Sequence, residues 1–122
     1  MSFPPKDRDM DQVTRYKQIA KEIAIKTGEL GERPDDPVQT QFIFDDERGH
    51  YLLYFNGWRG EKRTYGSYLH IEVADAGKVY LHHDGTDLII AQQLMDRGIP
   101  KEHIVLAWQA PIKRGDRGVA VV

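Results

Sequence analysis

The sequence predicts an α+β fold in which an antiparallel meander of four or five strands carries two helices packed on one face. Four β-prone segments between residues 38 and 84 are separated by short polar turns that each contain glycine, as hairpins require. A helical apolar pattern precedes these segments, and a second helical segment with capping residues follows them. Helices at both ends of a short-turned meander favour a two-layer sandwich.

The first helix is predicted to start at Asp9 or Asp11, either of which can cap it, and to end near Thr27. Gly28 follows where a left-handed C-terminal cap is expected. One face of this helix is apolar, with residues at three- and four-residue spacings: Val13, Tyr16, Ala20, Ile23 and Ala24.

Four strands are predicted after a Gly- and Pro-containing loop at residues 29–37. They are expected at Val38–Asp45, His50–Trp58, Arg63–Ala74 and Lys78–Asp84. Their short connections favour antiparallel pairing between neighbours. A further apolar, β-prone segment at Ile104–Trp108 is predicted to be a last strand or a buried segment.

The second helix is predicted over Asp87–Arg97, capped by Asp84 or Thr86 and stopped by Gly98. The segment from Asp84 to Asp87 also has the appearance of a phosphate or ion loop at a helix start. However, its two carboxylates would repel an anion, and it lacks the lysine of a P-loop. Helix capping is therefore the favoured interpretation.

Composition restricts the class of protein. The 122 residues suit one domain, with 40% hydrophobic and 30% charged residues, no cysteine and a formal charge of −2. We expect a disordered extension at residues 1–8, a single domain at 9–114 and a tail at 115–122. The lack of a membrane-length apolar run and of a signal core predicts a cytoplasmic protein. The slightly negative net charge argues against direct contact with nucleic acid.

Strand alternation divides the side chains of the sheet into two sets. The mainly apolar set should face the helices: Phe42, Phe44, Tyr51, Leu53, Phe55, Leu69, Ile71, Val73, Val79 and Leu81. The opposite face should carry Gln41, Ile43, Asp45, His50, Leu52, Tyr54, Tyr68, His70, Glu72, Tyr80 and His82. The turn lengths predict a cross-strand row of Asp45, His50, Glu72 and Tyr80, beside a second row of Ile43, Leu52, His70 and His82.

Three interpretations of the second face remain open. Its His, Asp and Glu side chains are suitable metal ligands or proton carriers, although no helical metal-binding motif supports a metal site. Its mixture of tyrosine, histidine and aliphatic residues favours a surface for a partner or for self-association. It could also be a partly exposed face held by Asp45–His50 and His50–Glu72 hydrogen bonds.

An ordered set of motifs resembles the XisI family of cyanobacterial element excision controlling factors. The resemblance extends from about Val13 to Arg114 and rests on the following residues: Gln41, Asp45-x-Glu47-Arg48-x-His50-Tyr51, Gly57-Trp58, Arg63-x-Tyr65-Gly66, His70-Ile71-Glu72, Asp84-Gly85-Thr86, Gly98-Ile99-Pro100-Lys101 and Ile104-Val105-Leu106-Ala107. It implies an accessory role in the excision of a DNA element by a site-specific recombinase. The partners that it implies are an XisH-type protein and the recombinase complex.

The resulting prediction is a non-enzymatic regulatory protein with no cofactor and no metal, acting through protein contacts and able to form a homo-oligomer. The predicted contact surface comprises Asp45, His50, Tyr54, Tyr68, His70, Glu72, Tyr80 and His82. One alternative is a metal-dependent hydrolase or nuclease-like enzyme that uses Asp45, His50 and Glu72. Another is direct DNA binding through Lys113, Arg114 and the lysine-rich face of the first helix.

Overall fold

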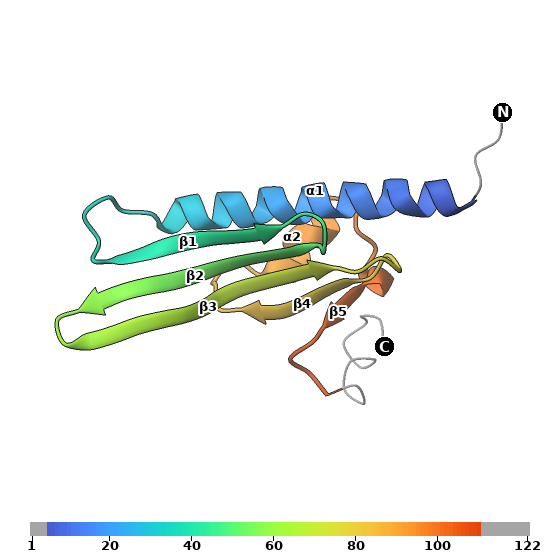
Figure 1. Ribbon diagram of the computed structural model, residues 1–122. Coiled ribbons are helices and arrows are strands. Elements are labelled where there is room, and N and C mark those ends of the chain that lie inside the picture. The colour runs from blue at the N-terminus through green and yellow to red at the C-terminus, as the bar shows by residue number, and fades with distance from the viewer. Residues whose placement is uncertain (1–4, 111–122) are drawn as a thin grey trace.

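The computed structural model describes the backbone of residues 5–110 and the side chains from Gln12 onward. Its elements confirm the predicted α+β class (Figure 1). They are, in chain order, α1 (Pro5–Gly31), β1 (Val38–Asp45), β2 (His50–Arg59), β3 (Lys62–Val73), β4 (Val79–Asp84), α2 (Ile90–Asp96), the 3₁₀ turn η1 (Lys101–His103) and β5 (Ile104–Leu106). None of the helices in this part of the chain has the length and apolar character needed to cross a bilayer.

The five strands form one sheet in the order β1-β2-β3-β4-β5. The first four pair antiparallel through hairpins, at boundaries within about two residues of those predicted. The predicted last strand is present as β5, but it pairs parallel to β4. A parallel neighbour requires a crossover, and α2 and η1 supply it. The sheet is therefore an antiparallel meander with one short parallel edge.

Both helices pack on the same face of this sheet and share one core. The predicted stripe of α1 is buried, and Ile90 and Leu94 of α2 join it. The sheet contributes side chains that are fully inaccessible to solvent: Tyr51, Leu53, Leu69, Ile71, Val73, Val79 and Leu81. Figure 1 shows α1 lying along the sheet beside β1 and β2. No described helix covers the opposite face, which we call the outer face.

The ends of α1 differ from the prediction. The helix starts at Pro5, where a missing N–H costs nothing because the first-turn donors are unpaired in any case. Residues 5–8 belong to α1 in the structure, whereas residues 1–4 and the predicted tail at 115–122 lie outside the described residues. The helix also continues past Gly28 to Gly31, so the predicted cap at Gly28 is wrong.

Gly28 has a packing role instead of a capping role. A Cβ atom built at this position would overlap the ring of Phe42 and would lie 3.2 Å from Leu53 Cδ2. A glycine here lets α1 approach the sheet closely enough for Phe42 to pack against the helix backbone. A glycine is thus required at position 28, but for close contact between the helix and the sheet and not for the end of the helix.

The start of α2 was also predicted too early. The helix begins at Ile90 and not at Asp87, because Ile89 has a left-handed backbone with φ 51°. The Asp84 carboxylate nevertheless accepts hydrogen bonds from the backbone N–H of Ile90 at 3.0 Å and of Thr86 at 2.9 Å. The N-cap position is occupied by Ile89 and not by Asp84 or Thr86, but the Asp84 carboxylate still satisfies a backbone donor at the helix start from within the preceding turn.

Candidate functional site

The outer face contains the two cross-strand rows expected from the hairpin turns, with one change. Asp45 pairs with His50, His50 with Glu72, and Glu72 with Tyr80, as predicted. In the second row Ile43 pairs with Leu52 and Leu52 with His70, but His70 then pairs with His83 instead of His82. A register irregularity between His70 and Ile71 causes this shift.

A second irregularity, between Leu53 and Tyr54, corrects the placement of Tyr68. Because Leu53 pairs with Leu69 and Tyr54 with Ser67, Tyr68 is an extra residue on β3. Its ring stacks on Phe55 with centroids 4.0 Å apart, on the side of the sheet that packs against the helices. The Tyr68 hydroxyl lies 3.1 Å from Thr40 Oγ1. The prediction that Tyr68 lies on the outer face is therefore wrong.

Three histidines and one glutamate form a connected group on the outer face. His50 Nδ1 lies 3.0 Å from His70 Nε2, and the rings of His70 and His82 have centroids 4.5 Å apart. The Glu72 carboxylate lies 2.8 Å from His82 Nε2 and 3.8 Å from His50 Nε2. Tyr80 stacks beside His82 at 5.9 Å. Thus β2, β3 and β4 each contribute to a single polar and aromatic surface.

Asp45 does not join this group. Its carboxylate accepts hydrogen bonds from the backbone N–H of Arg48 at 2.9 Å and from the Arg48 guanidinium at 3.1 Å, closing the β1–β2 turn. These bonds hold the pKa of Asp45 below its ordinary value. The hydrogen-bond partner of Asp45 is therefore Arg48, and not His50 as the third interpretation expected. A nuclease-like reaction would need Asp45, His50 and Glu72 together. In the structure Asp45 is bound within the turn, while His50 and Glu72 belong to the histidine group.

The histidine group also lacks the geometry of a metal site. His50 directs Nδ1 at His70 and Nε2 at Glu72, so its two nitrogens point to different neighbours. Within the described residues, no set of three or more His, Asp or Glu side chains is placed to hold a metal ion. The nitrogen and oxygen atoms contact one another instead of converging on a shared point.

The surroundings of His70 favour its neutral form. Burial first, and then the neighbouring His82, His50 and His83, together lower the pKa of His70 to about 4 against the opposing effect of Glu72. The ring is therefore uncharged at neutral pH, and it can accept or donate one hydrogen bond through each nitrogen according to its tautomer. A neutral ring between other rings suits a contact surface, since a partner can cover it without desolvating a charge.

The distal half of the β2–β3 hairpin extends the outer face with residues that the sequence prediction did not include. Trp58 and Tyr65 are 54% and 63% exposed. The Arg63 guanidinium lies 5.6 Å from the Trp58 ring and 5.0 Å from the Tyr65 ring. Tyr65 also lies 5.6 Å from the ring of Tyr54. Alternation along β2 could have identified Trp58, whereas Tyr65 reaches the outer face only because of the extra residue at Tyr68.

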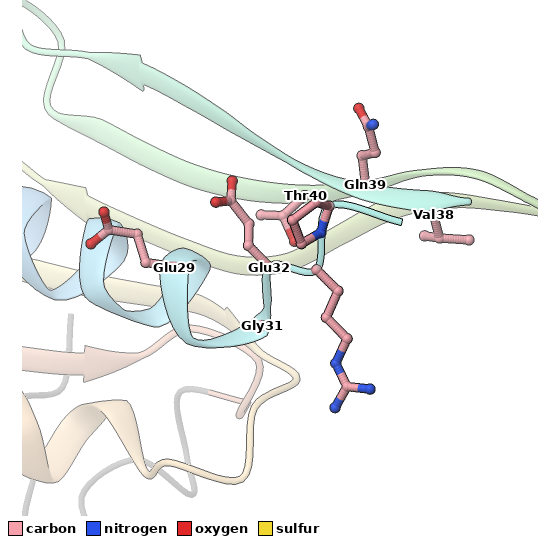
Figure 2. A pocket seen from close by; sticks show the side chains of 8 residues that line it. Glu29, Gly31, Glu32, Val38, Gln39 and Thr40 are labelled. Atoms are coloured by element: carbon pink, nitrogen blue, oxygen red, sulfur yellow. The ribbon is translucent and has the colours of Figure 1, made fainter. Parts of the chain in front are cut away.

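Three hollows in the described part of the chain lie away from the histidine group. One of about 500 Å³ is formed between the end of α1 and the start of β1, and Figure 2 shows Glu29 and Glu32 on the α1 side of it. Val38 and Thr40 line it from the strand. It contains none of the residues predicted for a site.

Some of the cations proposed for DNA binding lie in the part of the chain that the structure describes. Lys113 and Arg114 lie outside the described residues. On α1, Lys21 forms an ion pair with Asp46 at 2.9 Å, and Lys17 donates a hydrogen bond to the backbone carbonyl of Glu47 at 3.2 Å. These two lysines bind the β1–β2 turn of the same chain, so they do not form a free basic stripe for phosphates.

Comparisons with known proteins agree with the resemblance seen in the sequence. The family model described as XisI protein matches residues 10–121. A XisI-like protein from Anabaena variabilis has 34% identity and a TM-score of 0.83, and the match covers 90% of this chain and 99% of that one. The fdxN element excision controlling factor XisI from Anabaena variabilis has 31% identity and a TM-score of 0.81, with 91% and 99% covered. No curated protein sequence matches.

Proposed function

The chain belongs to the XisI family, and from this premise we propose that it is a controlling factor for the excision of a DNA element. The Anabaena protein of 31% identity that is named for this role aligns over 99% of its length, which supports the transfer. We propose further that the chain acts through protein contacts rather than catalysis. The first partner to test is an XisH-type protein, and contact with the recombinase complex is the second.

One observation carries the proposed mechanism: the sheet has an outer face that no described helix covers and that is rich in aromatic and histidine side chains. Tyrosine and tryptophan are enriched at protein interfaces, where they bury a large area at low entropic cost. Two rings at the hairpin end are more than half exposed. Such a surface is costly to leave in water, and a partner that covers it removes that cost.

The polar groups of the outer face support a contact surface better than a reaction centre. The ring nitrogens of His50, His70 and His82 lie 2.8 to 3.8 Å from one another or from the Glu72 carboxylate. A general base must instead be directed at the proton that it removes. Groups that are already paired can be buried beneath a partner without leaving unsatisfied donors or acceptors.

The test is a binding measurement with an XisH-type protein as the immobilised partner. Replacement of two outer-face rings, Tyr54→Ala with Tyr80→Ala, should weaken binding by about tenfold or more, because interface tyrosines are frequent hot spots. The matched control, Leu30→Ala with Leu88→Ala, removes two exposed side chains, 74% and 40% accessible, outside the outer face. Equal binding by the two double variants would refute the assignment of the outer face.

A further inference from the structure

The two edges of the sheet are not alike. One edge, β5, has only three residues, and a short edge offers little for another chain to pair with. The other edge, β1, has eight residues, and no described strand pairs with it on the side away from β2. A free edge of this length carries a row of backbone donors and acceptors without partners in the sheet.

Strand β1 also lacks the features that usually prevent edge-to-edge pairing. From Val38 to Phe44 it contains no lysine, no other charged residue and no proline, and its pairing with β2 has no bulge. Phe42 and Ile43 are 36% and 47% exposed. By comparison, the β2–β3 hairpin is irregular and its tip carries Arg59, Lys62 and Arg63. Residues 62–68 of β3 also lack a partner on the side away from β2, but this stretch contains Lys62, Arg63 and the extra residue Tyr68, so β1 is the longer regular edge without charge.

We propose that β1 pairs antiparallel with β1 of a second copy of this chain, so that the two sheets join into one about a twofold axis. An antiparallel strand pair is the arrangement in which one strand edge complements itself, because each residue i that faces j is matched by a j that faces i. A second copy therefore supplies a strand of the same eight residues. Its residues 38–44 carry no charge, so the two strands do not repel each other.

The charges at the ends of β1 permit this pairing. A twofold axis near Gln41 brings the Asp45 end of one copy beside the Asp36 end of the other. Each of these carboxylates is already paired with an arginine of its own chain, Asp45 with Arg48 at 3.1 Å and Asp36 with Arg59 at 3.3 Å. The Arg48 side chain is 72% exposed in this pair, so its guanidinium keeps donors that can contact an acidic group of the second copy.

The position of α1 leaves room for the second copy. The helix contacts β1, β2 and β3, so it is centred over β2 and not over the free edge. With strands about 4.8 Å apart, that places α1 about 7 Å from the axis and the two α1 helices about 14 Å apart. This exceeds the 8–10 Å of directly packed helices, so the pairing causes no clash between them.

The proposed pairing also determines how the outer faces are presented. A twofold axis normal to a continuous sheet keeps the outer faces of both copies on the same side. If the partner-binding role proposed above is correct, the dimer offers two equivalent binding surfaces in one plane. The pairing itself does not depend on that role, because it rests on β1 alone.

The test is the molar mass of the purified full chain, measured by light scattering after size exclusion over a range of concentrations and with no partner present. The expected mass is about twice the 14.1 kDa of the chain. The variant Gln39→Lys with Ile43→Lys places lysines at exposed positions that face each other across an axis at Gln41. It should raise the dimer dissociation constant about tenfold or more.

A matched control separates edge pairing from a general effect of charge. Gln92→Lys with Leu88→Lys makes the same two kinds of substitution at exposed positions away from β1, and it should leave the dimer intact. Gln41→Lys alone is the second edge variant if the double variant does not fold. A monomeric wild type at every concentration, a dimer unaffected by both edge variants, or equal disruption by the control would overturn the proposal.

Discussion

Acidification from about pH 7.5 to about pH 5 should destabilise the fold through His70. In the folded protein, burial and the neighbouring His50, His82 and His83 hold the pKa of this ring at about 4, against an ordinary value of 6.5. The unfolded chain therefore binds a proton at His70 below about pH 6.5, whereas the folded chain does not until the pH approaches 4. Stability is complete above this window and falls as the pH falls through it.

The size of the effect follows from the pKa difference. A pKa lowered from 6.5 to about 4 corresponds to a loss of about 3 kcal/mol once the pH is below both values. At about pH 5 the loss would be about 2 kcal/mol if the ring were fully buried. His70 is only partly buried, so solvent screening reduces the expected loss at that pH to about 1 kcal/mol.

Urea unfolding at the two pH values measures this loss directly. The variant His70→Gln keeps a polar side chain that cannot be protonated, so its free energy of unfolding should fall about 1 kcal/mol less than that of the wild type. His83→Gln is the control at an exposed position of the neighbouring strand, and it should retain most of the wild-type decrease. Parallel decreases for wild type and His70→Gln would refute the reasoning.

Two further substitutions test the packing. Gly28→Ala should lower the free energy of unfolding by about 1–3 kcal/mol, because the added Cβ overlaps the Phe42 ring, whereas Gly31→Ala, with no atom within 4 Å of its Cβ position, should not destabilise. Tyr16→Phe should cost about 1–2 kcal/mol in chemical unfolding, because the buried hydroxyl lies 2.8 Å from His103 Nδ1 and 3.2 Å from Gln12 Nε2. Tyr65→Phe, at a largely exposed position, should change stability by less than about 0.5 kcal/mol; a Tyr16 effect no larger would count against the hydrogen bond.

The sequence was most informative where turn length determines strand pairing. The four-residue link between Asp45 and His50 sets the β1–β2 register, and the link at residues 75–77 places Glu72 opposite Tyr80. The His50–Glu72 pair between them does not follow from turn length, because the register of β2 and β3 shifts by one residue between the hairpin tip and this row. The burial of Leu53, Ile71 and Leu81 followed from alternation alone.

The sequence was less informative where contacts between distant segments decide the local conformation. The extra residue on β3 is Tyr68, whose ring stacks on Phe55 of β2. No local sequence pattern marks that contact. Gly28 signalled a helix end by propensity, but its actual role depends on Phe42 in another element. The Asp45 carboxylate accepts hydrogen bonds from Arg48 within the turn, in place of the bond with His50 that strand pairing suggested.

The most direct test of the central claim is hydroxyl-radical footprinting of the chain alone and in complex with an XisH-type protein. If the outer face binds the partner, Tyr54, Trp58 and Tyr65 should lose reactivity in the complex. Leu30, which is 74% exposed at the end of α1, should not change. Protection of Leu30 with unchanged oxidation of the three outer-face rings would contradict the account.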